Sequence, residues 1–509
     1  MFSNPKLLLT IIPVIIFGAI IFPLFRKKEI KRWHFWTILL LGVLIFIIQV
    51  FFYYGFFVDD AFISLRFAKN LADGYGLNFN RDGGRPVEGY SNFLWIILEV
   101  PCFLLGLEPV IYVKILSLLL GLTGLLLVYK LGLAVSDDKR VGLLCLWSLA
   151  IVPMYALWSM GGLEATLYIA LGLSMVLMWM RGRSGFLLGF LMLLVSFARN
   201  EGAIYFIVWF VMALVNGKGR MKREDVFALS IFILGYIAYE VFRIVYFGDI
   251  LPNTFYAKVK FGWGIMIGKV IQKAPFYFYL SPLMLLAVGN FIDKDRDRRN
   301  LWLAVIAISM GLSGFLAYRE WMPGWRYALP MVPFITVLGI RTLVRTYDKY
   351  KIKYGLAIVV LFIVFAHLLL GNIYIYENRI NYKIIYRGYL DVSNYLKEAN
   401  KDRDFSIALQ DMGIIPFCSG ATKAYDFHPE GILSRETTRK GYDYKYFINK
   451  RPDFFILIFD DLPPNGKPGN EFIRNIYEDS DFTSNYSFDR AFKNDAGRTL
   501  TIFRRTDFH

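Results

Sequence analysis

Long runs of apolar residues, separated by short polar segments, dominate the chain up to about residue 376. A helix needs about 20 mostly apolar residues to cross the hydrocarbon core of a bilayer. The pattern therefore predicts an α-helical polytopic membrane protein. About 12 transmembrane helices are expected, at 7–25, 37–57, 110–130, 141–158, 163–180, 184–198, 202–215, 226–247, 270–290, 301–318, 325–341 and 355–376.

Three of these runs need a further decision. The run at 7–25 is followed by no small-residue cleavage site, so it is predicted to be an anchor rather than a removed signal peptide. The runs at 184–198 and 202–215 are shorter than a straight crossing requires. They are separated only by Arg199, Asn200 and Glu201, which leaves two possibilities, a tight helical hairpin or a buried re-entrant pair.

The segment 93–107 is apolar but short, and it contains a glutamate and a proline. Its placement decides the side of every later loop. If it does not cross, the loops on the side of 26–36 hold 22 Lys and Arg, against 12 if it crosses. Basic loops stay on the cytoplasmic side, so 93–107 is predicted to lie along the outer surface. Loop 58–92 and the C-terminus are then extracytoplasmic.

The composition changes after residue 376. Residues 377–509 hold 20 Lys and Arg and 20 Asp and Glu, with helical periodicity at 387–400 and strand-like runs at 405–409, 454–459 and 499–503. The sequence thus predicts two domains, a transmembrane catalytic domain at 1–376 and a small extracytoplasmic α/β domain at 377–509.

Charge and cysteine content exclude some functions. The chain has 509 residues, of which 56% are hydrophobic, and a net charge of +16. Since the excess positive charge lies in loops beside membrane spans, it indicates topology and contact with anionic lipids rather than nucleic-acid binding. Cys102, Cys145 and Cys418 lie far apart, as do the four histidines, so neither a disulfide framework nor a His/Cys zinc site is expected.

The loop 58–92 carries the most distinctive chemistry. Asp59 and Asp60 directly follow the second apolar run, and the residues after them show the spacing of a short amphipathic helix in the membrane interface, ending at Gly74. One aspartate could simply cap this helix. The alternative is that one of them is a general base that removes a proton from an acceptor hydroxyl at the outer membrane face.

Several motifs together resemble the GT-C membrane glycosyltransferases, and most closely the mycobacterial terminal β-(1→2)-arabinofuranosyltransferase and its relatives. The matching motifs span most of the chain. They are 59–71 with 74–77, 87–95, 162–164, Arg199-Asn200-Glu201-Gly202, 248–258, 326–330 and 411–416. Relatives usually carry proline where Asn200 stands, and the first span, 7–25, is an addition to the family core.

The resemblance implies transfer of a sugar from a polyprenyl-phosphate donor to a glycan or glycoconjugate acceptor at the outer face of the cytoplasmic membrane. It implies that Asp59 or Asp60 is the base. The candidate ligands of the donor phosphate are Arg66, Arg199, Lys258 and Arg326. The candidate ligands of the sugar or acceptor are Glu88, Tyr90, Glu164, Glu201, Asn253 and Tyr256, and Asp411 and Asp426 are possible additions.

Each candidate also has a structural interpretation. A lone Lys or Arg at a helix end can extend to the interface, and Asp is common in turns. Glu240 and Arg243 are expected to form an intrahelical pair, with a place in a lipid-carrier groove as the alternative. No cofactor is required, although a divalent cation at the aspartates is possible. The alternative function is a transporter or flippase of lipid-linked saccharides, which typically shows repeated halves.

Overall fold

The computed structural model describes residues 30–258, 263–292, 298–316, 322–350, 363, 386–401, 403–463, 466–494 and 497–508. The chain divides into two compact units. The helical unit comprises Met1–Phe56, Val113–Ile237 and Phe261–Arg379, and the mixed unit comprises Phe57–Tyr112, Ala238–Lys260 and Ile380–His509. The predicted span 7–25, and 355–376 apart from residue 363, lie outside the described residues.

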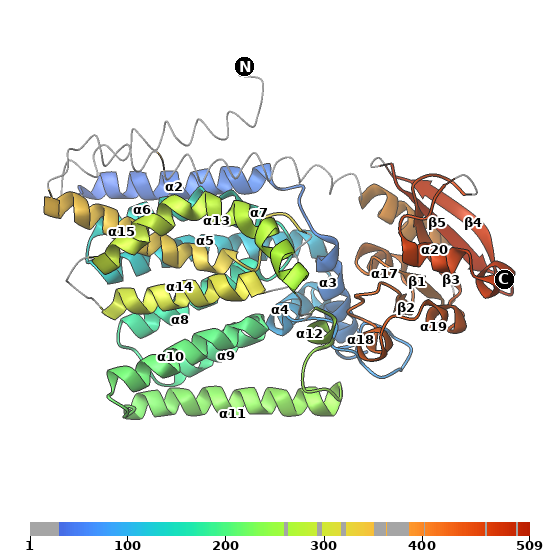
Figure 1. Ribbon diagram of the computed structural model, residues 1–509, viewed down its shortest axis with the longest axis horizontal. Coiled ribbons are helices and arrows are strands. Elements are labelled where there is room, and N and C mark those ends of the chain that lie inside the picture. Colours follow the sequence, from blue (N-terminus) through green and yellow to red (C-terminus); the bar gives the residue numbers. More distant parts are fainter. Residues whose placement is uncertain are drawn as a thin grey trace, which may run out of the picture. The chain divides into compact units, whose positions relative to one another are not determined.

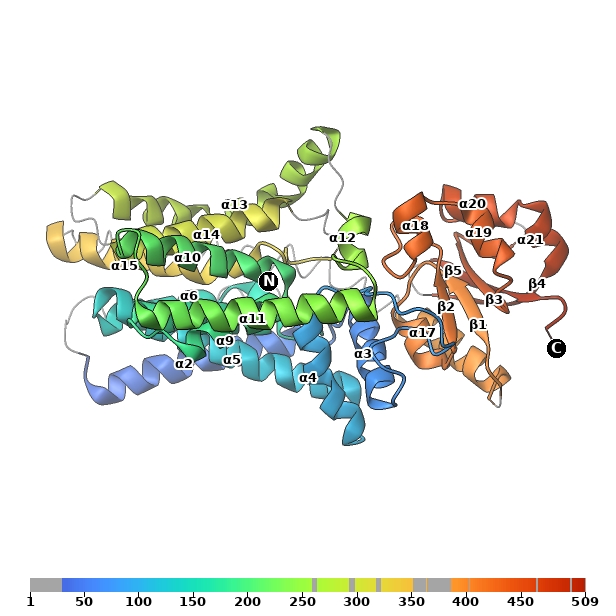
Figure 2. The same cartoon turned by 90° about the horizontal axis from the view of Figure 1, so that it is seen from below.

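The helical unit consists of helices that run side by side (Figures 1 and 2). Two of the boundaries between the two units fall within helices, namely α5 and α11. The elements are α2 (Arg32–Phe52), α5 (Pro109–Ser136), α6 (Lys139–Ala150), α7 (Pro153–Trp158), α8 (Ala165–Met180), α9 (Phe186–Ala198), η1 (Asn200–Gly202), α10 (Ala203–Asn216), α11 (Arg223–Tyr246), α13 (Trp263–Ile292), α14 (Arg298–Leu316), η2 (Leu329–Met331) and α15 (Val332–Tyr350).

Six helical segments of the described residues are long and apolar enough to cross a membrane. They are Arg32–Phe52, Pro109–Ser136, Arg223–Tyr246, Ile267–Phe291, Arg298–Leu316 and Leu329–Lys349. The predicted total of about 12 is not confirmed. The predicted span 141–158 is two helices, because Pro153 cannot continue α6 and instead begins α7.

The paired short helices α9 and α10 contact each other and are joined by the single 3-10 turn η1. This packing fits both predicted arrangements, the tight hairpin and the re-entrant pair. The third short segment, α4 (Phe93–Leu104), has 12 residues and thus extends about 18 Å, which is less than the roughly 30 Å hydrocarbon core.

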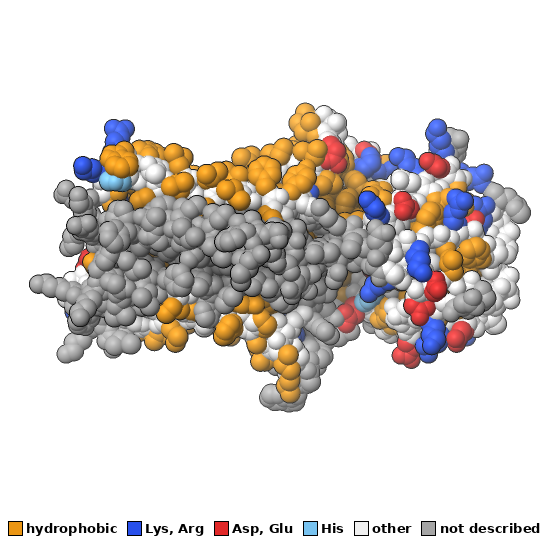
Figure 3. All heavy atoms as spheres, turned by 90° about the horizontal axis from the view of Figure 1, so that it is seen from above, with side chains coloured by type: hydrophobic (Ala, Val, Ile, Leu, Met, Phe, Trp, Pro, Cys, Tyr) orange, Lys and Arg blue, Asp and Glu red, His pale blue; other side chains and the backbone are white. Residues whose placement is uncertain are grey.

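Burial separates an inner helix from peripheral ones in the helical unit. In the segment Leu329–Lys349, 78% of the most apolar window is buried, against 17% in Arg223–Tyr246. The side chains exposed on α2 and α11 are largely Leu, Ile, Val and Phe, and hydrophobic side chains also cover the described helices in Figure 3. Such an apolar exterior is typical of helices that face lipid.

The mixed unit contains a five-stranded sheet in the order β2-β1-β3-β5-β4. β2, β1 and β3 are parallel, whereas β5 pairs antiparallel with both β3 and β4. In Figure 2, α19, α20 and α21 lie along one side of the strands. The strands are β1 (Ser406–Leu409), β2 (Lys423–Asp426), β3 (Phe454–Phe459), β4 (Tyr486–Lys493) and β5 (Thr499–Arg505).

The helices of this unit come from three parts of the sequence. They are α3 (Asp59–Ala72), α4, α12 (Asn253–Lys258), a helix over 386–399, α17 (Ile414–Ser419), α18 (Arg435–Lys440), α19 (Tyr444–Asn449), α20 (Glu471–Tyr477) and α21 (Ser480–Asn485). The predicted helix at 387–400 and the three predicted strands are confirmed. The central strand β3 is buried at all six positions, which explains its uninterrupted apolar sequence.

The loop 58–92 is part of this unit and is attached to the sheet edge. The side-chain amide of Asn80 donates to the carbonyl oxygen of Ala424 (3.2 Å), and its oxygen accepts from the backbone N–H of Ala424 (2.9 Å). The N–H of Arg81 also donates to the carbonyl oxygen of Thr422 at 2.9 Å. The loop therefore occupies hydrogen-bonding groups of the edge strand β2, which would otherwise be open.

The predicted helix after Asp59 is confirmed as α3. Its spacing predicts a polar face of Arg66, Lys69 and Asp73, of which Lys69 and Asp73 form an exposed ion pair, whereas Arg66 is only 5% exposed. Its guanidinium donates to the backbone carbonyls of Phe79 (2.8 Å) and Ala421 (2.7 Å), and also to that of Pro416. These contacts give Arg66 a structural role, since its donors tie α3 to the chain around α17.

Candidate functional site

Asp59 and Asp60 are the first two residues of α3, but the side chain of neither caps this helix. Its N-cap is Val58, without a side-chain hydrogen bond. The carboxylate of Asp59 instead accepts the backbone N–H of Gly413 (3.0 Å) and of Ile414 (2.9 Å), at the start of α17. The simple capping interpretation is therefore wrong for α3, and Asp59 binds the amides of a segment 354 positions away.

Other carboxylates lie close to Asp59 and Asp60. Asp411 and Asp426 lie at or just beyond the carboxyl ends of the parallel strands β1 and β2, where α/β folds usually bind ligands. We call Asp59, Asp60, Asp411 and Asp426 the aspartate cluster. The hydroxyl of Tyr389 donates to Asp411 at 2.5 Å, and the N–H groups of His428 and Leu433 donate to Asp426 at 3.2 and 3.1 Å.

The crowding of carboxylates and their burial change their acidity. Burial, together with the negative charge of Asp411, raises the pKa of Asp59 to about 8, despite the two amide donors. Burial and the nearby Asp411 and Asp60 raise the pKa of Asp426 to about 7. The cluster therefore holds protons near neutral pH, as is common at sites of acid–base chemistry.

Glu88 belongs to a buried ion pair rather than to an open surface. It is 3% exposed and accepts from Arg243 (2.8 Å) and from the hydroxyl of Tyr239 (3.2 Å). Arg243 also pairs with Glu240 at 2.6 Å, which confirms the expected intrahelical pair. The neighbouring Tyr90 is 3% exposed and packs on aromatic rings of the core. Neither residue is placed to reach an acceptor without rearrangement.

The candidates in segment 253–258 anchor α12 to α18. Asn253 is 2% exposed, donates to the carbonyl of Ile432 (2.7 Å) and accepts from Thr438 (2.7 Å). The guanidinium of Arg439 lies 3.2 Å from the ring centre of Tyr256. Lys258 ends α12, but its side chain lies outside the described residues.

Four predicted residues of the helical unit come together from well-separated positions. Arg199 forms an ion pair with Glu164 and a second with Glu201 (3.1 Å), and Arg326 lies 3.9 Å from Glu164. We call Glu164, Arg199, Glu201 and Arg326 the arginine cluster. The two arginines are 4% and 8% exposed, and Glu164 is 2% exposed. Two positive and two negative charges therefore balance each other, and all but Glu201, whose side chain is 33% exposed, are buried.

Local backbone geometry positions the members of the arginine cluster. Arg199 ends α9, and Glu164 precedes α8 without capping it. Arg326 follows Gly324 and Trp325, both of which adopt positive φ (90° and 44°), so the chain turns sharply there. Trp325 is an uncommon residue at positive φ, and such strain often accompanies functional sites.

Several residues of the two clusters carried no signal in the sequence. Trp158, Tyr168 and Tyr327 place aromatic rings under the two arginine guanidinium groups, at 4.7 to 5.9 Å. Gly413 is required beside Asp59, because an added Cβ would collide with the aspartate carboxylate. The 411–416 motif pointed to this segment, whereas the aromatic residues were hidden among many others in apolar runs.

The described residues include no group of three or more His, Cys, Asp or Glu side chains arranged to hold a metal ion. The predicted divalent cation at the aspartates thus gains no further ligand set from this part of the chain.

No protein-family model and no curated protein matches the sequence. Solved structures do match. ArnT from Cupriavidus metallidurans in the apo state is 12% identical, with a TM-score of 0.61 over 91% of this chain and 97% of that chain. The structure of the same protein bound to undecaprenyl phosphate gives 12% identity and 0.56 over 92% and 98%. The Archaeoglobus fulgidus oligosaccharyltransferase in complex with Zn and sulfate gives 12% identity and 0.52 over 76% and 62%.

The chain therefore shares the fold of these solved structures. The six candidate spans indicate a membrane protein. At such identities the likeness extends to the fold alone, and function must be argued from the sites.

Proposed function

We propose that the protein is an integral-membrane glycosyltransferase that moves a sugar from a polyprenyl-phosphate donor to a glycan or glycoconjugate acceptor. One observation carries the proposal. An aspartate pair opens α3 within a fold shared with ArnT, a protein whose structure has been solved with undecaprenyl phosphate bound. The proposed location is the extracytoplasmic face of the cytoplasmic membrane, supported by the distribution of basic loops.

We assign the general base to Asp60 and a positioning role to Asp59. Both oxygens of Asp59 accept backbone amides, so this side chain is engaged in holding the start of α3 against α17. Asp60 takes the proton of the acceptor hydroxyl as its oxygen forms a bond to the anomeric carbon of the donor. The bond between that carbon and the phosphate oxygen breaks, and the phosphate leaves with the bonding electrons.

The leaving phosphate needs positive charge, and the arginine cluster has the chemistry to supply it. We assign the phosphate contact to Arg326, which lies 3.9 Å from Glu164 and donates to the hydroxyl of Tyr327 at 3.1 Å. Arg199 is held by Glu164 and Glu201 and therefore orients the cluster. The motif resemblance favours arabinofuranose as the sugar, and we propose it as the first donor to test.

The decisive experiment compares variants of the purified full-length protein in nanodiscs with radiolabelled polyprenyl-phosphate sugars, including an arabinofuranose and a hexose donor. We expect Asp60→Asn to reduce turnover by about 10²–10⁴-fold, the usual contribution of a general base. Asp73→Asn is the matched control, because Asp73 follows the same helix and forms exposed ion pairs.

Near-normal turnover of Asp60→Asn would overturn the assignment of the base. Mass spectrometry of the co-purifying lipid separates the proposal from the transporter alternative. A polyprenyl phosphate supports a transferase, whereas an intact lipid-linked oligosaccharide that the protein translocates without cleavage would favour a flippase.

A further inference from the structure

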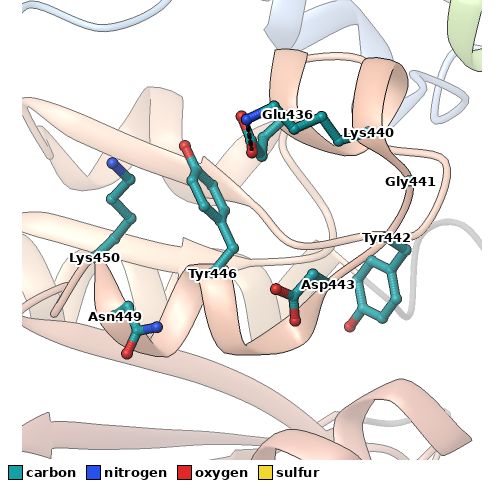
Figure 4. A pocket seen from close by; sticks show the side chains of 8 residues that line it. All are labelled: Glu436, Lys440, Gly441, Tyr442, Asp443, Tyr446, Asn449 and Lys450. Atoms are coloured by element: carbon teal, nitrogen blue, oxygen red, sulfur yellow. Dashed lines mark ion pairs between the residues drawn. The ribbon is translucent and has the colours of Figure 1, made fainter.

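A pocket on the mixed unit lies between α18 and α19, outside both clusters. Its volume is about 410 Å³, which falls within the range of about 300–1,000 Å³ that is usual for small-molecule sites. Figure 4 shows side chains from both helices and from the turn between them around this space. Those that matter here are Glu436, Lys440, Asp443, Tyr446, Asn449 and Lys450.

An aromatic ring forms one wall of the pocket. Tyr446 projects from α19 toward the end of α18 in Figure 4, and the ammonium group of Lys450 lies 4.9 Å from its ring centre. Tyrosine offers a rigid apolar surface together with a hydroxyl, at low conformational cost. A flat apolar face beside polar groups suits a ligand that has C–H groups on one side and hydroxyls around its edge.

The polar groups of the pocket include both donors and acceptors, and their charges cancel. Lys440 and Lys450 are positive, and Glu436 and Asp443 are negative, with Glu436 paired to Lys440 at 2.9 Å. Asn449 adds an amide that both donates and accepts. A strongly charged ligand would face like charge on one side, whereas a neutral polyhydroxylated ligand can use every group.

Capping hydrogen bonds, one of them made by the pocket residue Asp443, hold the two helices in place. Ser434 caps α18 by accepting the N–H of Thr437 (3.2 Å), and Asp443 caps α19 by accepting the N–H of Lys445 (2.9 Å). Asn253 further attaches α18 to α12. Because these contacts are made without a ligand, the pocket is formed in advance, which lowers the cost of binding.

We propose that the pocket between α18 and α19 is a sugar-binding subsite that takes a neutral sugar residue of the acceptor glycan. The identification of the ligand as part of the acceptor rests on the proposed function. The recognition of a neutral sugar is tested without any transfer. The subsite would hold the acceptor through Tyr446 stacking and through hydrogen bonds to Asp443 and Asn449.

The first experiment measures binding by the full-length protein in nanodiscs, using saturation-transfer NMR and calorimetry. The probes are neutral oligosaccharides of arabinofuranose, mannose, galactose and glucose, with glucose 6-phosphate as the charged comparison. We expect saturable binding of at least one neutral oligosaccharide and weaker binding of the phosphorylated sugar. Tyr446→Ala should weaken that binding at least tenfold, while Tyr446→Trp should retain it.

The matched control is Tyr444→Ala, since Tyr444 is on the same helix but does not line the pocket. It should bind as the wild type does. Absence of saturable binding to the whole panel would overturn the proposal, as would an unchanged affinity in Tyr446→Ala. Tighter binding of the phosphorylated sugar would identify an anion site instead and would equally overturn it.

The second experiment separates this inference from the proposed function. In the transfer assay, Tyr446→Ala should raise the acceptor KM about tenfold and leave kcat nearly unchanged. Asp60→Asn should lower kcat, leave the acceptor KM nearly unchanged, and still bind the oligosaccharide. If no donor supports transfer while Tyr446-dependent binding persists, the proposed function fails and the sugar subsite stands. If transfer occurs with an unchanged acceptor KM in Tyr446→Ala, the subsite fails alone.

Discussion

The arginine cluster of the helical unit and the aspartate cluster of the mixed unit both bury ionisable side chains, but they are stabilised in different ways. In the arginine cluster, two guanidinium groups face two carboxylates, so opposite charges offset the loss of water. In the aspartate cluster, carboxylates face each other, and backbone amides and raised pKa values stabilise them instead.

The difference indicates what each cluster can do. A balanced set of charges presents fixed positive groups to an anion, provided that the anion competes with the resident glutamates. A set of like charges exchanges protons near neutral pH, which suits proton transfer. The contrast supports the proposed anion binding by the arginine cluster and the proposed proton transfer by the aspartate cluster, and each prediction below tests one of the two clusters.

Removal of Arg199 should have the largest effect on stability. Arg199→Ala leaves Glu164 buried with one partner fewer, and breaking a buried pair in this way typically costs about 3–5 kcal/mol. We expect this loss in the free energy of unfolding, measured by chemical denaturation in detergent micelles. The exposed Arg220→Ala should change stability by less than about 0.5 kcal/mol and serves as the control.

A double variant shows whether the effect comes from charge imbalance. Glu164→Gln combined with Arg199→Gln removes both charges of the ion pair and leaves a neutral amide at each position. It should recover more than half of the lost stability, yet it should not recover sugar transfer. If Arg199→Ala alone is as stable as the wild type, the cluster is not a buried, balanced set of charges.

Gly413→Ala should have the next largest effect, this time in the aspartate cluster. The new Cβ would meet both the carboxylate and the backbone oxygen of Asp59. Inserting a methyl group into such a closed space typically costs about 1–3 kcal/mol. We expect a loss of about 2 kcal/mol, measured by the same denaturation, and a several-fold lower turnover.

Gly268→Ala tests whether any Gly→Ala change in this chain is damaging. A Cβ at Gly268 meets nothing within 4 Å, and the residue lies inside helix α13. Alanine favours a helix over glycine by about 1 kcal/mol, so this variant should be as stable as the wild type or slightly more stable. Equal stabilities of Gly413→Ala and Gly268→Ala would show that Asp59 does not pack on α17.

Part of this architecture could be predicted from local patterns alone. Apolar runs predicted most helices, and the short period of apolar residues predicted β1, β3 and β5, because each pattern is a local consequence of burial. Charge counting predicted that segment 93–107 does not cross the membrane. The helix α4, which forms most of this segment, has only 12 residues. The motifs also pointed to Glu164, Arg199, Glu201 and Arg326, which the fold brings together.

The rest depends on contacts between distant segments, which leave no periodic trace. The burial of Arg66 and the attachment of Asn80 to β2 arise because loop 58–92 joins the C-terminal sheet in one unit. The sequence predicts Glu88 as a ligand of the sugar or acceptor, and nothing near it in sequence shows that Arg243 pairs with it. The strands β2 and β4 were missed, since their burial patterns are mixed.

The pH dependence of stability offers the smallest and most specific test. The pKa of Asp59 is about 8 in the folded protein, above its ordinary value of 3.8, so folding favours the protonated form. Its stabilising contribution is therefore complete below about pH 4 and is lost as the pH rises through 8. Between pH 6 and 7 the stability advantage of the wild type over Asp59→Asn should fall by about 1.4 kcal/mol, since the loss between the two pKa values is about 1.4 kcal/mol per pH unit. Thermal and chemical unfolding at pH 6, 7 and 8 measures this difference, and the double variant of the arginine cluster should keep the wild-type pH dependence. A difference between the wild type and Asp59→Asn that stays constant over this range would mean that Asp59 carries its charge at neutral pH, and the contrast between the two clusters would not hold.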